Sequence, residues 1–226
     1  MKMHFASYYR WLVFSFLFEA DGFPPETSAP ILDVGSKRGE FLQRFTSPQK
    51  VALDIKPELL PRDDGTLLRV VADAACLPVR AQTFGYVLMN DVIEHVQDDR
   101  SALRGAALAL APGGYLWLST PAVDYAVGPE FITRRFERAW GHVRRGYRPE
   151  TLAQAFGPGF NIRTVLWPEP LVRLLQTPLW ALSRVAMPVA RWMARACFDY
   201  DRHVYLSGNS TGSLNGHIYI SAQRNL

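Results

Sequence analysis

The chain has 226 residues, of which 48% are hydrophobic and 20% charged, values that exclude a disordered or low-complexity protein. A chain of this length buries a sizeable core without disulfide bonds, and Cys76 and Cys197 form no metal-ligand spacing. The net charge of +4 fits an anionic substrate or membrane surface but is too small to indicate nucleic-acid binding by itself. We therefore expect reduced thiols, no metal site, no signal peptide or transmembrane helix, and a cytoplasmic protein that could associate with membranes.

The chain begins with an aromatic helical pattern from Phe5 to Glu19, which ends before a pair of prolines. Apolar runs then alternate with helical patterns over Gly35–Phe45, residues 98–110 and residues 150–156. The runs that predict strands are residues 31–34, 51–54, 67–72, 86–89, 115–119 and 160–167, with a last strand at 217–222 after the turn-rich stretch 207–216. Short apolar strands separated by helices predict a parallel sheet that is covered on both faces.

Polar side chains and glycines follow the first predicted strand, in Asp33-Val-Gly35-Ser-Lys37-Arg-Gly39. Ligands of open parallel sheets bind beyond the carboxyl ends of the strands. Gly35 can make the tight turn, Gly39 lets the next helix approach, and free N–H groups there could hold a carboxylate. The Gly-x-x-x-Gly spacing is weak evidence alone, because such turns are common between strands and helices.

The next three strands also end on polar side chains. Asp54 could accept both hydroxyls of a ribose, although a turn or helix cap before Pro57 is an equal alternative. Asp73 could face an adenine amino group, or could cap a helix. Asn90 and Asp91 close the fourth strand, near the place of a transferred group. Each of the four successive strands ends on a polar residue, and this regular order argues against a coincidence.

Five segments together resemble the ordered motif set of class I S-adenosylmethionine-dependent methyltransferases, and most closely the small-molecule group that includes the quinone-biosynthesis enzymes. These segments are ILDVGSKRGEF, VALDIKPE, VADAACLP, FGYVLMNDVIEHV and LAPGGYLWLSTP. The resemblance covers residues 28–165, and GHVRRGYRPETLAQAFGPGF resembles that group's segment ahead of the sixth strand.

The resemblance implies S-adenosyl-L-methionine as the cofactor and a role for each strand end. Gly35 and Gly39 would border the methionine part, together with Asp33 and Lys37. Asp54 would bind the ribose, Asp73 with Ala74 the adenine, and Asn90 would lie beside the methyl-bearing sulfur.

The resemblance also implies a doubly wound, mostly parallel seven-stranded sheet with an antiparallel last strand. We expect a single methyltransferase domain over residues 1–226. Its parts would be an N-terminal helical cap (1–27), a cofactor-binding core (28–168), a helical insertion (169–202) and a C-terminal strand region (203–226).

Lys37 departs from the family pattern, which usually has a third glycine at this position. An inward Lys37 side chain could pair with the cofactor carboxylate or block the pocket, so a catalytically inactive binding or regulatory protein is one alternative. A nucleic-acid methyltransferase is another, but Asn90-Asp91-Val-Ile lacks the Asn-Pro-Pro-aromatic clamp for flipped bases. A dehydrogenase is disfavoured because no Gly-x-Gly-x-x-Gly follows the first strand.

Methyl transfer from a sulfonium needs an in-line nucleophile, and a base only if the acceptor loses a proton. His142 is the first candidate base because a neutral-pKa histidine suits proton removal, with a structural histidine as the alternative. His95 is a weaker candidate. Tyr8 and Tyr9 could offer aromatic faces to the sulfonium, or could simply pack an amphipathic helix.

The segment 170–198 contains four arginines and no acidic residue. Arg173, Arg184, Arg191 and Arg195 are spaced 11, 7 and 4 residues apart, which would align them on one face of a helix, unless Pro178 and Pro188 break it into shorter stripes. A basic face opposite apolar side chains is typical of a helix in a membrane interface and would favour a lipid-like acceptor. A helical cap over the active site and a dimer contact are the alternatives, and the oligomeric state is left open.

Overall fold

The fold is that of a computed structural model, which describes residues 3–23, 26–62, 65, 67–208 and 216–226. The chain forms two compact units. The sheet unit comprises residues 25–123, 141–166 and 217–226, and the helical unit comprises residues 1–24, 124–140 and 167–216.

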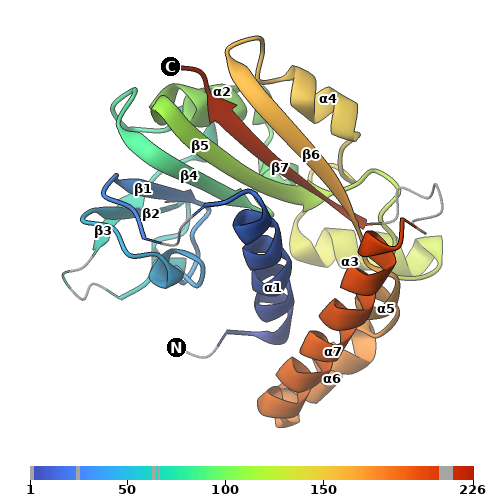
Figure 1. The fold of residues 1–226 in the computed structure, drawn as a ribbon. Coiled ribbons are helices and arrows are strands. Elements are labelled where there is room, and N and C mark those ends of the chain that lie inside the picture. Colours follow the sequence, from blue (N-terminus) through green and yellow to red (C-terminus); the bar gives the residue numbers. More distant parts are fainter. Residues whose placement is uncertain (1–2, 24–25, 63–64, 66, 209–215) are drawn as a thin grey trace. The chain divides into compact units, whose positions relative to one another are not determined.

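The sheet has seven strands in the order β3-β2-β1-β4-β5-β7-β6 (Figure 1). Their bounds are β1 Ile31–Val34, β2 Lys50–Asp54, β3 Leu67–Val71, β4 Phe84–Asn90, β5 Leu110–Pro121, β6 Phe160–Pro168 and β7 Gly216–Arg224. The pairs β1–β2, β2–β3, β1–β4 and β4–β5 are parallel, and β5–β7 is antiparallel. The predicted mostly parallel sheet with an antiparallel last strand is confirmed.

The strand order reverses between β1 and β4. From β1 the chain adds β2 and then β3 on one side, and it returns to add β4 and β5 on the other. All four residues of β1 and most of β4 are buried, as expected for apolar strands at the centre of a parallel sheet. The carboxyl ends of β1 and β4 therefore flank the crevice where open sheets bind their ligands.

The helix predicted between Gly35 and Phe45 is wrong. The described chain there forms turns and a short 3-10 helix, η1 (Leu42–Arg44). Gly35, Lys37 and Gly39 have φ angles of 68°, 46° and 65°, and three left-handed residues within five positions cannot continue a right-handed helix.

Short 3-10 helices also stand in the next two crossovers: η2 (Pro57–Leu59) between β2 and β3, and η3 (Ala74–Cys76) between β3 and β4. A further one, η4 (Ile93–His95), follows β4. The α-helices of the sheet unit are α2 (Asp99–Ala109) and α4 (Pro149–Gln154), which come later in the chain. The edge strand β3 accordingly keeps Leu68 and Val71 exposed, so the predicted cover on both faces is incomplete at this edge.

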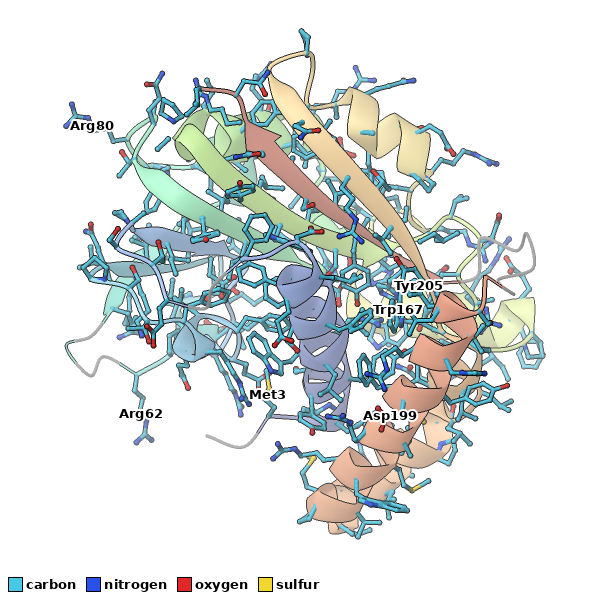
Figure 2. The ribbon with its side chains drawn as sticks, viewed as in Figure 1. Met3, Arg62, Arg80, Trp167, Asp199 and Tyr205 are labelled. Carbon is cyan, nitrogen blue, oxygen red and sulfur yellow. The ribbon has the colours of Figure 1, made fainter. Side chains whose placement is uncertain are left out.

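The helical unit contains α1 (Phe5–Ala20), α3 (Glu130–Trp140), α5 (Pro170–Leu174), α6 (Gln176–Val185) and α7 (Met187–Leu206). The sequence analysis did not predict α3. Trp167 packs against Tyr205 of α7, with ring centroids 4.9 Å apart (Figure 2). Most of the predicted turn-rich stretch 207–216 lies outside the described residues. Across the described chain, every helix is too short or too polar to cross a membrane.

A buried polar network joins α1 to α7 in the helical unit. The Tyr9 hydroxyl donates to Asp201 Oδ2 at 2.6 Å and accepts from Trp167 Nε1 at 3.1 Å. Asp201 also accepts from the backbone N–H groups of Leu171 and Val172, where α5 begins. Because buried polar groups need partners, this one carboxylate fixes three segments relative to one another.

Candidate functional site

The turn after β1 requires a glycine at position 35. A Cβ atom on Gly35 would lie 2.5 Å from Val92 Cγ2, in addition to the strain of a positive φ. Lys37 also adopts a positive φ, and its side chain is exposed. Glycine is therefore needed at position 35 so that the turn can pack against Val92, while the Lys37 side chain is not buried among the atoms of the turn.

The two acidic residues at the ends of β1 and β2 are both buried, but they have different partners. Asp54 accepts hydrogen bonds from the backbone N–H groups of Lys37 and Lys56, each at 3.0 Å. Asp33 accepts from the Ser36 hydroxyl at 2.8 Å, and burial raises the pKa of Asp33 to about 7, with the negative charge of Asp54 adding to the rise. Asp54 thus sits among backbone donors, where it can also accept the hydroxyls of a ribose.

Asp73 is exposed and accepts a hydrogen bond from the backbone N–H of Ala75 at 2.8 Å. It caps η3, and Ala74 beside it is buried. The cap that was the alternative explanation of Asp73 is therefore present in the structure, and adenine binding by Asp73 stays a prediction.

Asn90 ends β4 with a buried amide nitrogen that has no hydrogen-bond partner within the described chain. A buried donor without a partner costs about 1–3 kcal/mol, and a polar ligand atom would remove that cost. The glycine turn at Gly35, the carboxylate of Asp54 and the unpaired amide of Asn90 together fit a nucleoside ligand that carries polar groups.

A second polar cluster follows Asn90 directly. Asp91 has a φ of 51° and accepts from the Ser119 hydroxyl at 2.8 Å. Glu94 is buried and accepts from the Thr120 hydroxyl at 3.1 Å. Burial raises the pKa of Glu94 to about 8, and the charge of Asp91 adds to the rise.

His142 lies against His95, with ring centroids 4.8 Å apart and ring planes at 79°. The Gly141 carbonyl is 3.2 Å from His95 Nδ1. Burial lowers the pKa of His142 to about 4, with the neighbouring His95 as the next cause. The predicted near-neutral pKa of His142 is therefore wrong for this structure: the ring is uncharged at neutral pH and is a weaker base than an ordinary histidine.

Glu94, His95 and His142 offer ligand atoms that all lie within 4.8 Å of one another. A carboxylate and two uncharged imidazoles are a donor set that divalent transition metals accept. From the sequence we expected no metal, and His95 was considered only as a weaker candidate base. The sequence analysis also missed His217, a buried histidine of β7 whose Nε2 is 3.8 Å from Asp91 Oδ1.

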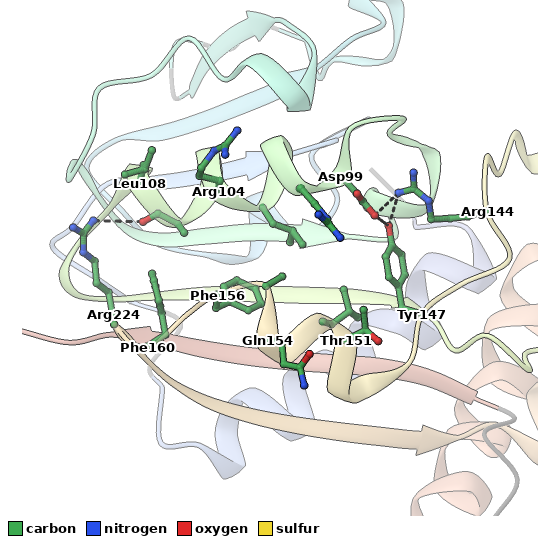
Figure 3. Close-up of a pocket in the computed structure, with 16 residues that line it drawn as sticks. Asp99, Arg104, Leu108, Arg144, Tyr147, Thr151, Gln154, Phe156, Phe160 and Arg224 are labelled. Atoms are coloured by element: carbon green, nitrogen blue, oxygen red, sulfur yellow. Dashed lines mark hydrogen bonds and ion pairs between the residues drawn. The ribbon is translucent and has the colours of Figure 1, made fainter.

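A separate groove of about 860 Å³ lies between α2, α4 and the start of β6 (Figure 3). At one end, Tyr147 donates to Asp99 at 2.7 Å and Arg144 pairs with the same carboxylate at 2.6 Å. At the other end, Arg224 donates to the Leu110 carbonyl at 2.8 Å, at the amino end of β5. The groove therefore extends to the edge of the sheet opposite the strand carboxyl ends and includes none of the predicted cofactor residues.

The two tyrosines of α1 have partners within the helical unit. Tyr9 is buried in the network with Asp201, and the guanidinium of Arg191 lies 4.5 Å from the centroid of the Tyr8 ring. These contacts agree with the packing alternative for both residues.

Comparisons with known proteins agree with this geometry. A family model described as a methyltransferase domain matches residues 9–164, which is more than half of the chain. A ubiquinone biosynthesis O-methyltransferase of Xanthomonas oryzae is 33% identical over a region that covers 55% of this chain and 59% of that protein. The matched region is thus little more than half the length of the curated relative.

Solved structures show the same fold at low identity. Phosphoethanolamine N-methyltransferase 2 of Haemonchus contortus, in complex with S-adenosyl-L-methionine, has a TM-score of 0.65 and 16% identity over 93% of this chain and 51% of that chain. An S-adenosylmethionine-dependent methyltransferase of Mesorhizobium loti has a TM-score of 0.58 and 18% identity, covering 91% and 95%. The [4+2]-cyclase SpnF also shares the fold, with a TM-score of 0.54 and 17% identity over 89% and 76%, so the fold serves more than one chemistry.

Proposed function

The chain belongs to the methyltransferase domain family, whose enzymes use S-adenosyl-L-methionine, and we propose that it transfers the methyl group to a hydroxyl of a small ring-bearing acceptor. The observation that carries the proposal is the ordered set of polar groups at the strand carboxyl ends, where Asn90 keeps an unpaired buried amide. The name of the Xanthomonas oryzae relative supports oxygen as the accepting atom. An acceptor with a lipid-like tail is consistent with that name.

The residues at the strand ends have two roles, binding the cofactor and holding the turn after β1, and Asp54 has both. Gly35, Asp54 and Asn90 bind the cofactor, through close backbone approach, ribose contacts and an amide hydrogen bond respectively. When bound, S-adenosyl-L-methionine supplies an electrophilic methyl group whose carbon–sulfur bond breaks as the acceptor oxygen attacks. The buried pair of β1 and β2 carboxylates holds the turn on which this binding depends.

The cluster after β4 handles the acceptor proton. His142 is uncharged at neutral pH and so is able to accept the proton that the hydroxyl loses. Because its pKa is about 4, proton transfer from an ordinary hydroxyl is unfavourable unless the hydroxyl is itself acidified. The donor set of Glu94, His95 and His142 would alternatively hold a divalent cation, which would acidify the hydroxyl by binding its oxygen. In that case the lone pair of His142 would be used by the metal, and the proton would pass to solvent and not to His142.

The proposal is tested by incubating the full chain with S-adenosyl-L-methionine and a prenylated catechol, with the same ring fully O-methylated as the control. Mass spectrometry is expected to detect one added methyl group on the catechol and none on the blocked ring. Parallel reactions with a chelator and with added Mg²⁺, Mn²⁺ or Zn²⁺ show whether the Glu94 cluster works with a metal.

A folded chain that binds the cofactor but methylates no hydroxyl, amine or thiol acceptor would contradict the proposal. That result would favour a binding or regulatory protein that retains the fold.

A further inference from the structure

We propose that the junction of α6 and α7 is a docking surface for the interface of an anionic lipid bilayer. Four apolar side chains at this junction are exposed to solvent: Trp180 (46%), Val185 (84%), Val189 (47%) and Trp192 (71%). We call these four residues, with Arg184, the α6–α7 tip. The proposal concerns binding alone and does not depend on the acceptor or on methyl transfer.

The opposite faces of the two helices already pack inside the helical unit. The buried residues of α7 begin with Ala190, Ala194 and Cys197, which recur every three or four residues. At about 100° per residue, Trp192 lies on the other side of the helix from this buried stripe. In α6 the buried residues are Leu179 and Ser183, and Val185 likewise points away from them. The tip is therefore a face that the helical unit leaves without internal packing.

The sequence left two alternatives for the four arginines, one stripe or shorter stripes separated by the prolines, and the structure divides the arginines among three helices. Arg173 lies in α5, Arg184 in α6, and Arg191 and Arg195 in α7. Pro178 and Pro188 fall in the first turns of α6 and α7, where proline is tolerated, so α6 and α7 are separate helices. A basic stripe along one continuous helix is thus wrong.

The charge that remains near the tip is still positive. The Arg184 guanidinium is exposed and lies 3.7 Å from the centroid of the Trp180 ring. Arg195 is paired with Asp199 at 3.1 Å, so Arg195 contributes little net charge. Since the segment 170–198 contains no acid, nothing within it repels anionic headgroups.

Tryptophan is the side chain that best suits the boundary between headgroups and hydrocarbon, because its large ring is apolar and its N–H needs a polar partner. Two exposed tryptophans with two valines between them and a cation beside them match an in-plane interfacial site better than a protein partner of mixed charge. The described helices do not span a membrane, so the tip would enter only the interface. Because the tip has four apolar side chains and Arg184 as its exposed cation, we expect apolar insertion to give most of the affinity and anionic lipid a smaller share.

The test is flotation of the full chain with vesicles of phosphatidylcholine containing anionic phosphatidylglycerol, without any methyl donor. Trp192→Ser is expected to weaken partitioning about tenfold, because a large side chain would no longer leave water. Trp180→Ser is expected to act in the same direction, and Arg184→Gln to reduce only the preference for anionic over neutral vesicles. Leu206→Ser is the matched control, since Leu206 is an exposed apolar residue at the far end of α7.

Circular dichroism of each variant establishes that it is folded, and quenching by brominated lipid locates the tryptophans. Quenching in wild type that falls in Trp192→Ser supports docking through the tip. Failure of the folded wild type to float overturns the proposal, as does flotation that Leu206→Ser reduces as much as Trp192→Ser. Analytical ultracentrifugation tests the alternative that a second copy of the chain binds the tip. A wild-type dimer that Trp192→Ser converts to a monomer would support this alternative and contradict membrane docking.

Discussion

The backbone N–H of Lys37 donates a hydrogen bond to the carboxylate of Asp54 at 3.0 Å. This bond connects the glycine turn after β1 to the acid at the end of β2. It also shows how the chain accommodates a lysine where the family usually has glycine: Lys37 keeps the left-handed backbone of the turn, with a φ of 46°. The turn thus has a left-handed backbone at Lys37 despite the bulkier residue, and Asp54 helps to hold this shape.

Replacing Lys37 by glycine is expected to raise the free energy of unfolding by about 0–1.6 kcal/mol. Removing the strain of a left-handed lysine gains about 1–2 kcal/mol, and the more flexible unfolded chain offsets about 0.4–1 kcal/mol. Chemical denaturation measures the change. Lys37→Ala is the control, because alanine keeps a Cβ and should give no gain. A loss of stability in Lys37→Gly would mean that the lysine side chain holds the turn.

Asp33→Asn is expected to change how stability depends on pH. The pKa of Asp33 in the fold is about 7, above its unfolded value of about 3.9. The protonated carboxyl therefore contributes its full stability below about pH 4, and this contribution is lost as the pH rises to 7.

Between pH 5 and 7 the amide variant should gain stability relative to the wild type, by up to about 1.4 kcal/mol per pH unit. Thermal or urea unfolding at pH 5, 6, 7 and 8 gives the difference, in which the shifts of Glu94 and Asp201 cancel because both proteins contain them. A difference that does not vary with pH would show that Asp33 is ionised in the fold.

Tyr9→Phe is expected to lower the free energy of unfolding by about 1–3 kcal/mol, since it leaves the buried Asp201 carboxylate and the Trp167 N–H without a shared partner. Tyr8→Phe is the neighbouring control and should cost much less, because the partner of the Tyr8 hydroxyl is the solvent-exposed Arg195 and not a buried carboxylate. Equal losses in the two variants would mean that the hydrogen bonds of Tyr9 stabilise the helical unit no more than those of Tyr8 do.

His142→Asn is expected to lower kcat by about 10²-fold or more with any hydroxyl acceptor, while the affinity for S-adenosyl-L-methionine stays unchanged. The reason is that the variant removes the group nearest to His95 and Glu94 but touches none of Gly35, Asp54 and Asn90. His203→Asn, in α7, is the control. A variant that retains full kcat would assign His142 a structural role.

If the Glu94 cluster holds a cation, Glu94→Gln should weaken Zn²⁺ or Mn²⁺ binding by at least tenfold in a titration of the metal-free chain. His142→Asn leaves only one imidazole in the cluster and should also weaken metal binding by at least tenfold. Binding that survives both substitutions would place the metal elsewhere.

The sequence predicted the strands well because each is a short apolar run bounded by turn residues. The strand at 31–34 agrees with β1 at both ends, and the others differ by a few residues. The prediction of a helix from Gly35 to Phe45 was wrong because three residues in its first half have a positive φ. The apolar spacing of this segment resembles a helix, and hydrophobic periodicity does not reveal a positive φ. The helix α3 was missed, although Ile132, Phe136 and Trp140 recur every four residues, the spacing of one helix face.

The positions of the predicted cofactor residues at the strand ends could be anticipated, because each residue follows its own apolar run; their binding of the cofactor stays a prediction. The cluster of Glu94, His95, His142 and His217 could not be anticipated, since its members come from segments far apart in the chain. Only the order of the strands brings the start of β7 beside Asp91. The pKa of His142 was wrong for a related reason, because burial depends on packing that the sequence does not display.

The central claim is that S-adenosyl-L-methionine binds at the strand carboxyl ends through Asp54. Calorimetric titration with S-adenosyl-L-methionine and its demethylated product tests it most directly, with Asp54→Ala as the variant and Asp124→Ala, an exposed acid of the helical unit, as the control. The account predicts saturable binding that weakens roughly tenfold to a hundredfold in Asp54→Ala and is unchanged in Asp124→Ala, because the charged ribose contacts contribute about 1.5–3 kcal/mol. The absence of binding by folded wild type, or equal binding by Asp54→Ala, would contradict it.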